Sequence, residues 1–396
     1  LDHPGIFTVT GDRTNPGTGG TINTETIAGA SFFNVGTVNL GFIDMAGNVD
    51  GVDSNDVKNL TLFGNSISGS SGFGIDILDN NVVLIQQNSI TDNQGFNQVR
   101  IQVDRKLLDS TTSAVLPYQF SLVDNIVTDS TTIGNVGLGD MIAISTLPTG
   151  NGSALKLVVD KNGRTDTGGF IGFSANRGGG RAAFSTVWNG DLTASITGNN
   201  TRLSDRSGDV GFRITTTRAT SVNDINYQGN VLNDTAGSQD TGLLFDFTGS
   251  TTLTILDNYG LDATGNRAVD GIVMGTATTD QQDTAVDLTF RSTNNVVDIS
   301  RNQITFNATD STAVLFRTIS GPSAVNMDGN TIKLFDDGVL PNERGIIFQS
   351  VIGTIRLSSG GNQNNVVLPT ALRVTTFSIP TGTSSGSLLI NGSRVP

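Results

Sequence analysis

The sequence contains no Cys, a single His and a single Trp, and only two of its 36 acidic residues are Glu, which leaves 34 Asp. Without Cys there are no disulfides, thiolate metal ligands or cysteine nucleophiles. Glu and Lys normally fill the exposed faces of helices, and the chain has only five Lys. The abundant Asp, Asn and Gly favour turns instead. We therefore expect a β protein that turns often rather than a helical one.

The charge and the hydrophobic pattern exclude two further classes of protein. A net charge of −13 opposes a general attraction to nucleic acid or to an anionic membrane. No apolar run approaches the roughly 18 residues that a membrane-spanning helix needs. The chain begins at Leu1 rather than Met. A removed secretion signal is the simplest explanation, and it predicts an extracellular or cell-surface location.

A short alternating strand that ends in Asn recurs along the chain, as in LTLFGNSI around Asn65 and VLIQQNSI around Asn88. We call the Asn at the end of each such strand a mark. The spacing between successive marks varies from 23 to 44 residues, with a mean of 33. A second apolar strand follows each mark, for example GIDIL at 74–78 and GIVM at 271–274. We therefore predict two strands per repeat. The ten structural Asn marks are Asn65, Asn88, Asn125, Asn162, Asn199, Asn230, Asn258, Asn302, Asn330 and Asn362.

A unit this short cannot bury its own apolar face, so neighbouring units must stack. Two strands per unit fit a parallel β-helix better than a propeller, whose blades have about four strands. We predict an all-β chain with a capping, irregular β region at 1–58, a β-helix (β-solenoid) at 59–375 and a C-terminal strand and tail at 376–396. Equivalent Asn residues should lie about 4.8 Å apart and hydrogen-bond along a ladder.

The GNSI, QNSI and GNTI marks, each with a following GIxI or GIIF strand, resemble the repeats of the right-handed parallel β-helix of the pectin-lyase-like superfamily. The resemblance covers roughly residues 60–375, and it implies about ten to twelve irregular right-handed coils. That superfamily includes polysaccharide lyases and hydrolases, phage tailspikes, and passenger regions of bacterial adhesins and autotransporters. A structural motif of this kind specifies fold better than activity.

The catalytic signals are weak. The only histidine, His3, lies at the start of the chain, which argues against a Ser-His-Asp triad or a histidine metal centre in the body. Two Asp can hydrolyse a glycosidic bond, and Asp336 and Asp337 form one pair. The Asn-Thr-Asp and His-Gly segments that accompany such a pair in the polygalacturonase branch of the resembled superfamily are absent. We assign no catalytic residue, and we favour a protein that is not an enzyme.

Two segments are candidates for binding. Residues 164–218 hold seven of the 18 Arg, and Arg177 and Arg181 with Trp188 could grip an acidic glycan or a protein partner. Pairing of these Arg with Asp on adjacent coils is the simpler alternative. Asp50, Asp53 and Asp56 concentrate oxygen ligands as a Ca²⁺ loop requires, although a solvated turn would have the same composition. The spacing of these Asp departs from the EF-hand pattern, which favours the solvated turn, and structural Ca²⁺ is the alternative. No cofactor is required.

These observations favour a secreted or cell-surface microbial structural or adhesive β-solenoid. Self-association into a fibre, sheath or surface layer is its natural extension, because each coil end offers a template for strand pairing. The alternatives are a carbohydrate-active β-helix, either a polysaccharide lyase or a tailspike-like glycosidase, and a non-catalytic glycan-binding module.

Overall fold

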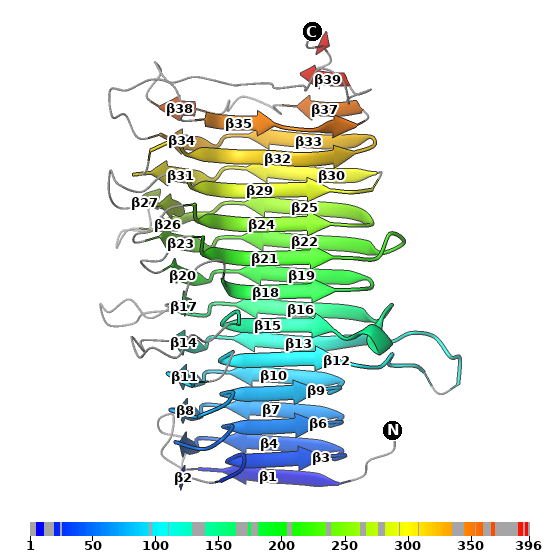
Figure 1. Cartoon of the computed structure of the whole chain (residues 1–396), viewed down its shortest axis with the longest axis vertical. Coiled ribbons are helices and arrows are strands. Elements are labelled where there is room, and N and C mark those ends of the chain that lie inside the picture. Colours follow the sequence, from blue (N-terminus) through cyan, green and yellow to red (C-terminus); the bar gives the residue numbers. More distant parts are fainter. Residues whose placement is uncertain are drawn as a thin grey trace. The chain divides into compact units, whose positions relative to one another are not determined.

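The computed structural model describes most of the chain (Figure 1). The chain divides into two compact units, 1–195 and 196–396, and the division falls within strand β19 (Leu192–Thr197). Each unit is described by itself below. The described residues are 5–11, 20–23, 26–94, 97–109, 111–128, 139–163, 173–175, 181–203, 208–234, 239–261, 267–275, 282–292, 294–307, 309–334, 344–352, 354–358, 366–368, 387–390 and 393–394.

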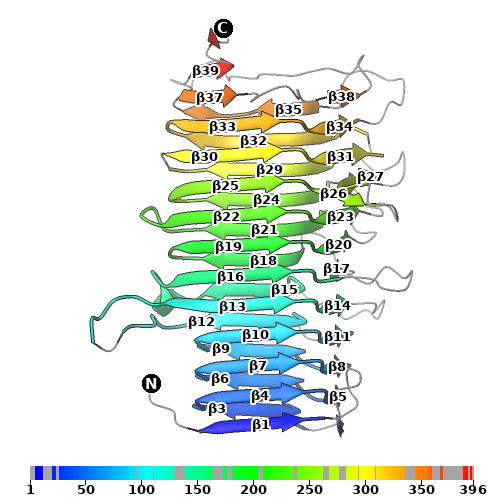
Figure 2. The ribbon, with the colours of Figure 1, turned by 180° about the vertical axis from the view of Figure 1, so that it is seen from behind.

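In unit 1 each coil gives one strand to each of three parallel sheets, here named A, B and C (Figures 1 and 2). Sheet A contains β1 (Ile6–Thr10), β4 (Thr37–Gly41), β7 (Asn59–Phe63), β10 (Val82–Gln86), β13 (Pro117–Val123) and β16 (Ala154–Asp160). Sheet B contains β2 (Thr21–Asn23), β5 (Asp44–Ala46), β8 (Ser66–Ser68), β11 (Ser89–Thr91), β14 (Ile126–Thr128) and β17 (Phe173–Ala175). Sheet C contains β3 (Ala30–Phe33), β6 (Val52–Asn55), β9 (Ile75–Leu78), β12 (Val99–Val103), β15 (Ile142–Thr146) and β18 (Ala182–Trp188). A 3-10 turn, η1 (Pro148–Gly150), follows β15.

Unit 2 repeats the same order of sheets. Sheet A contains β22 (Val222–Gln228), β25 (Ser250–Leu256), β30 (Asn295–Ser300), β33 (Ser323–Asp328), β37 (Thr354–Ser358), β39 (Ser387–Ile390) and β40 (Ser393–Arg394). Sheet B contains β20 (Asn200–Leu203), β23 (Val231–Asp234), β28 (Ile272–Met274), β31 (Gln303–Phe306), β34 (Thr331–Lys333) and β38 (Val366–Leu368). Sheet C contains β21 (Val210–Thr216), β24 (Thr241–Phe247), β29 (Thr284–Phe290), β32 (Thr312–Ser320) and β35 (Arg344–Phe348), and β36 (Val351–Ile352) also pairs with β32.

The predicted all-β, right-handed parallel β-helix is confirmed, and the described residues contain no α-helix. The prediction of two strands per repeat is wrong, because the described coils from β1–β3 to β33–β35 each have one strand in each of the three sheets. The strand missed by the sequence pattern is the short sheet B strand directly after the Asn, such as β8 and β11, which has three residues. A strand this short contains too few residues to display a clear period-two alternation.

Regular coils already occur in the region expected to form an irregular cap. Strand β1 pairs in parallel with β4, from Ile6 opposite Thr37 to Thr10 opposite Gly41, and β3 pairs in the same way with β6. The expected boundary at 58/59 does not coincide with any change in this pairing, because β4 continues onto β7. The coil that contains β4 and β5 has no Asn mark, because Ile43 lies at the position that Asn occupies in later coils. Its backbone N–H still donates to Asn65 Oδ1, the next member of the ladder.

Insertions account for the uneven period. In unit 2 the antiparallel hairpin of β26 (Tyr259–Leu261) and β27 (Arg267–Asp270) is inserted after Asn258 and lengthens that coil. The segment 271–274, predicted as the second strand of its repeat, is therefore the sheet B strand β28, and the sheet C strand follows as β29. In unit 1, residues 104–116 are inserted between β12 and β13 and are closed by a bridge between Leu108 and Val115.

Inward-facing residues of the three sheets form the core. In β7, Leu60 and Leu62 are buried while their neighbours are partly exposed, which is the period-two pattern of a strand with one buried face. Aromatic rings of successive coils also contact one another in unit 2: Phe212 packs edge-to-face on Tyr227 at 5.3 Å between ring centroids, and Phe247 packs on Phe290 in a tilted arrangement at 5.8 Å. The coil corners are filled differently, by short polar side chains.

Candidate functional site

A ladder of buried Asn side chains runs along the corner between sheets A and B of unit 1. From Asn88 onward, each Asn accepts two hydrogen bonds at Oδ1 from the Asn one coil earlier. At Asn125, they come from the backbone N–H of Asn88 at 3.0 Å and from its Nδ2 at 3.2 Å. Asn125 Nδ2 in turn donates to Ile85 O at 2.7 Å and to Asn162 Oδ1 at 3.0 Å. The amide therefore uses both its donor and its acceptor capacity.

The backbone before each of these Asn residues has to turn sharply. The preceding residue adopts the left-handed conformation, with φ of 64° at Gly64, 54° at Gln87 and 55° at Asp124. Gly adopts this conformation at the lowest cost, which explains the recurring Gly-Asn pairs of the sequence.

Unit 2 contains an equivalent ladder. The backbone N–H of Asn230 donates to Asn258 Oδ1 at 2.9 Å, and Asn302 Nδ2 donates to Asn330 Oδ1 at 2.9 Å. Its described members are Asn199, Asn230, Asn258, Asn302 and Asn330, all of them buried. The tenth mark, Asn362, lies outside the described residues.

The three carboxylates of the expected Ca²⁺ loop have separate surroundings. Asp50 Oδ1 accepts a hydrogen bond from the backbone N–H of Phe73 at 2.7 Å. Asp56 forms an ion pair with Arg105. Asp53 accepts a hydrogen bond from Ser31, and its partial burial, followed by the charges of Asp76 and Asp50, raises its pKa. Among the described residues, these three Asp are not a group whose carboxylate oxygens come close enough to share a cation.

The basic and aromatic patch also differs from the expectation. Trp188 is 0% exposed, and its Nε1–H donates to Ser153 O at 2.8 Å, so its ring is not available to stack on a glycan. A large apolar ring at the end of a strand gains more from burial than from exposure, and its one polar group has found a partner. Arg181 directly precedes β18 and is partly buried. Arg177, His3 and the Asp336–Asp337 pair lie outside the described residues.

A different acidic group lies at the corner between sheets B and C of unit 2. Asp234 is the last residue of β23, Asp240 directly precedes β24, and Asp283 directly precedes β29. All three are 0% exposed. One carboxylate oxygen from each lies within 4.8 Å of the others, and this is the one such group among the residues that the structure describes. We call it the Asp corner.

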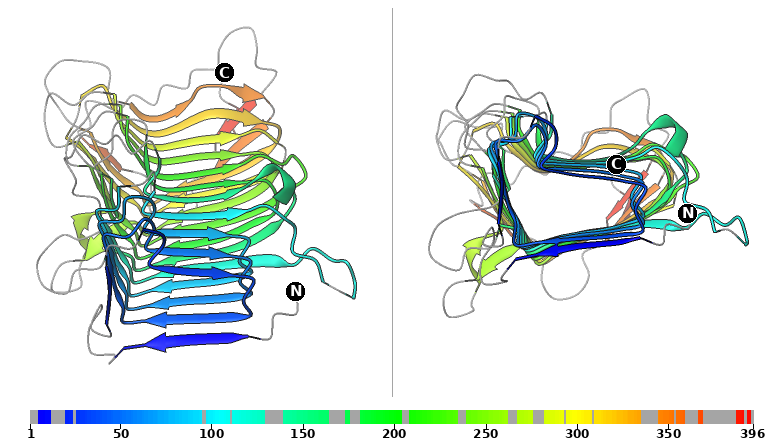
Figure 3. Two further views of the ribbon diagram at one scale, coloured as in Figure 1. Left: turned by 60° about the horizontal axis from the view of Figure 1, so that its bottom comes forward. Right: turned by 90° about the horizontal axis from the view of Figure 1, so that it is seen from below.

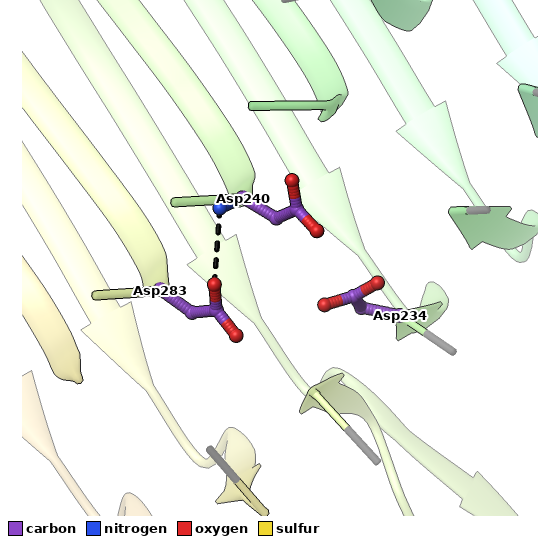
Figure 4. A group of neighbouring side chains, drawn as sticks. All are labelled: Asp234, Asp240 and Asp283. Atoms are coloured by element: carbon purple, nitrogen blue, oxygen red, sulfur yellow. Dashed lines mark hydrogen bonds between the residues drawn. The ribbon is translucent and has the colours of Figure 1, made fainter. Parts of the chain in front are cut away.

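Backbone N–H groups hold each carboxylate of the Asp corner in place, and Figure 4 draws the bond from Asp240 N to Asp283. Asp240 Oδ1 accepts from Asp209 N at 2.7 Å, and Asp283 Oδ1 accepts from Asp240 N at 3.0 Å. Asp234 Oδ2 accepts from Gly275 N at 3.0 Å. Figure 4 shows the carboxyl group of Asp234 pointing toward those of Asp240 and Asp283. The second oxygen of Asp240, Oδ2, is buried and has no hydrogen-bond partner.

Electrostatics at this corner disfavour a full set of negative charges. Burial, and then the charge of Asp234, raises the pKa of Asp240 to about 9, with Asp283 and Asp209 acting in the same direction. A buried carboxylate without a compensating charge is strongly disfavoured, so this corner must hold either protons or a cation.

Sequence reasoning missed the Asp corner, although a signal was present. Gln-Asp-Thr occurs at 239–241 and again at 282–284, each time just before a sheet C strand. In both copies the Gln is left-handed, with φ of 66° at Gln239 and 65° at Gln282. The repeat marks one corner, but Asp234 belongs to another strand and joins the group only through the fold.

The first coil of unit 1 is the other unusual feature. Phe7 and Val9 of β1 are opposite Val38 and Leu40 in register, yet they are 44% and 40% exposed, whereas Val38 and Leu40 are 0% and 3% exposed. Strands β1, β2 and β3 each pair on one side only, with the coil that follows (Figure 3). Among the described residues, no strand covers the outer edges of β1, β2 and β3. Inward-facing apolar side chains are thus exposed at this edge.

Comparison of the chain with protein-family models, with curated protein sequences and with solved structures found no match. Within the described residues, no helix has the length and apolar character needed to cross a membrane.

Proposed function

We propose that this chain is a secreted or cell-surface microbial structural protein that associates with further copies of itself through its first coil. The observation that supports the proposal is the exposure of Phe7 and Val9 in β1, at positions that the next coil buries. An edge that offers strands of three sheets at once matches another coil of the same cross-section, because such a coil can pair with all three strands together. A second copy of this chain is the occupant that we propose for this edge.

Assembly of this kind gives a fibre, a sheath or a surface layer. Within the pectin-lyase-like superfamily that the repeats resemble, the proposal places the chain with adhesin and autotransporter passengers, which act through shape and association. The glycan-binding alternative loses its aromatic platform because Trp188 is buried. No observation on the described residues favours the carbohydrate-active alternative over the structural one.

The test is a change of charge at the exposed edge. Phe7→Asp places a carboxylate among apolar side chains, including Phe32, whose ring lies 5.2 Å from that of Phe7. The wild-type chain should form larger species as its concentration rises, and Phe7→Asp should weaken that association at least about tenfold, since each buried aromatic anchor contributes 2 kcal/mol or more at an interface. Sedimentation velocity and electron microscopy measure the outcome.

The matched control is Val296→Asp, which changes another exposed apolar residue, 53% exposed, on strand β30. This variant should assemble as the wild type does. A wild-type chain that stays monomeric at all concentrations, or a Phe7→Asp variant that assembles normally, contradicts the proposal.

A further inference from the structure

We propose that Asp234, Asp240 and Asp283 form a buried divalent-cation site, best suited to Ca²⁺, at the corner between sheets B and C of unit 2. The inference is independent of the assembly proposed above, because it concerns a site inside unit 2 rather than the edge of the first coil.

The geometry fits one ion. One oxygen from each carboxylate lies within 4.8 Å of the others. Ca²⁺ binds oxygen at about 2.3–2.6 Å, so ligands on opposite sides of the ion are up to about 5 Å apart. A single Ca²⁺ can therefore contact all three side chains without a change in the backbone.

A second observation points to a ligand. Asp240 is 0% exposed and its Oδ2 has no hydrogen-bond partner. Its carboxylate faces the other two side chains (Figure 4). In the Asn ladder the corresponding side-chain atom is paired; Asn302 donates from Nδ2 to both Ile255 O and Asn330 Oδ1 at 2.9 Å. At the Asp corner the atom without a partner is a carboxylate oxygen next to two further buried carboxylates, and a cation bound by all three would pair it.

The donor set favours Ca²⁺ over other cations. The three side chains offer only carboxylate oxygens, which hard cations prefer, and transition metals would favour His or Cys ligands. Mg²⁺ usually keeps several waters and demands a near-ideal octahedron. A dry corner with three carboxylates suits the more flexible coordination of Ca²⁺. A divalent cation also balances two of the three negative charges that the low-dielectric corner would otherwise bring together.

The backbone has already oriented the ligands. Each carboxylate accepts one N–H at 2.7–3.0 Å, from Asp209, Asp240 or Gly275. These donors fix the direction of the side chains, as outer hydrogen bonds do around metal ligands.

The experiment uses the full chain, stripped of metal with chelator during unfolding and then refolded, because a buried site fills most readily as the chain folds. Calorimetric titration with CaCl₂ should show one saturable site. Thermal unfolding with Ca²⁺ at about 100 times the dissociation constant should have its midpoint about 5 °C higher than in chelator, and MgCl₂ should raise it less.

Asp240→Asn keeps the shape of the side chain and removes its charge, so its Ca²⁺ affinity should fall at least about tenfold. Its unfolding midpoint in chelator, equal to or above that of the wild type, verifies that the variant folds. Asp53→Asn, a change in the acidic segment of unit 1, is the control and should bind Ca²⁺ as the wild type does.

Three results would overturn the proposal. They are no Ca²⁺-dependent rise of the midpoint in the wild type, unchanged affinity in Asp240→Asn, and loss of binding in Asp53→Asn. A corner that holds protons instead would be stabilised by acid but not by Ca²⁺, which is the first of these results.

Discussion

Two buried corners of unit 2 have the same backbone arrangement and opposite chemistry. In the Asn ladder, the backbone N–H of Asn230 donates to Asn258 Oδ1 at 2.9 Å. In the Asp corner, the backbone N–H of Asp240 donates to Asp283 Oδ1 at 3.0 Å. The difference is the second terminal atom of the side chain, which is a donating NH₂ in Asn and an accepting oxygen in Asp.

This single atom decides whether equivalent side chains on successive coils can satisfy one another's hydrogen-bonding groups. An amide gives and receives, so each Asn in the ladder serves as donor to one neighbour and acceptor to the other. A carboxylate only receives, and a stack of carboxylates therefore depends on backbone N–H groups, protons or a cation. In unit 2, Asn residues lie at the corner that is stabilised by side-chain hydrogen bonds between coils, and Asp residues lie at the corner where we propose that an ion binds.

The largest effect is expected when the Asn ladder is given the chemistry of the Asp corner. Asn302→Asp turns the donating Nδ2 into an oxygen that faces Ile255 O and Asn330 Oδ1, both now at 2.9 Å from the nitrogen. We expect a loss of about 3–5 kcal/mol in the free energy of unfolding, because hydrogen bonds become repulsions and a charge is buried. Denaturation in urea measures this loss.

The control for this change is Asn226→Asp on the partly exposed outer face of β22, which should cost less than about 0.5 kcal/mol. A loss below about 1 kcal/mol for Asn302→Asp would show that the ladder amides do not matter for stability.

The converse change is expected to have a smaller effect of opposite sign. Asp240→Asn gives the Asp corner one NH₂ in place of the oxygen that has no partner, and it places a permanently neutral group where a carboxyl must otherwise take up a proton when no cation is bound. In chelator the variant should gain about 1–2 kcal/mol in the free energy of unfolding. In saturating Ca²⁺ the sign should reverse, because the wild type then gains the binding free energy. Asp224→Asn, at an exposed position of β22, serves as control, and a variant less stable than the wild type in chelator would contradict the comparison.

The smallest effect is expected for a partly exposed carboxylate of a sheet C strand that pairs with an exposed Arg. Arg291 pairs with Asp246 at 2.6 Å, and the Arg side chain is 56% exposed. Arg291→Ala should cost less than about 1 kcal/mol, and added salt should reduce the difference. Arg317→Ala should cost more, because Asp287, which is 2% exposed, loses its cation. Urea denaturation measures both variants. Equal losses in the free energy of unfolding would mean that burial of the carboxylate does not determine how much its Arg partner contributes.

The sequence predicted the Asn ladder well because its signal is local and repeated. Each mark combines a strand, a residue able to turn and an Asn. Gly64 provides the left-handed turn, and Asn65 donates from Nδ2 to Leu40 O and accepts at Oδ1 from the backbone N–H of Ile43. The alternation of apolar and polar residues along each strand then indicated strands with one buried face, which short repeats can bury only by stacking. The mark failed at the coil of Ile43, where an apolar residue takes the ladder position.

The sequence by itself determined that this chain is a stacked parallel β-helix, because short strands, turn residues and Asn recur at intervals too short for a unit to bury its own apolar face and with too few strands for a propeller blade. Only the tertiary structure decided which polar residues meet. Asp234 and Asp240 are joined by a corner, and Asp283 reaches them from the next coil. Stacking also buries Trp188, whereas Phe7 is exposed on β1, which among the described strands pairs only with β4. Whether a side chain is buried, and which side chains it meets, depends on how the strands of neighbouring coils align. Insertions of variable length prevent that alignment from being predicted from the spacing of residues along the chain.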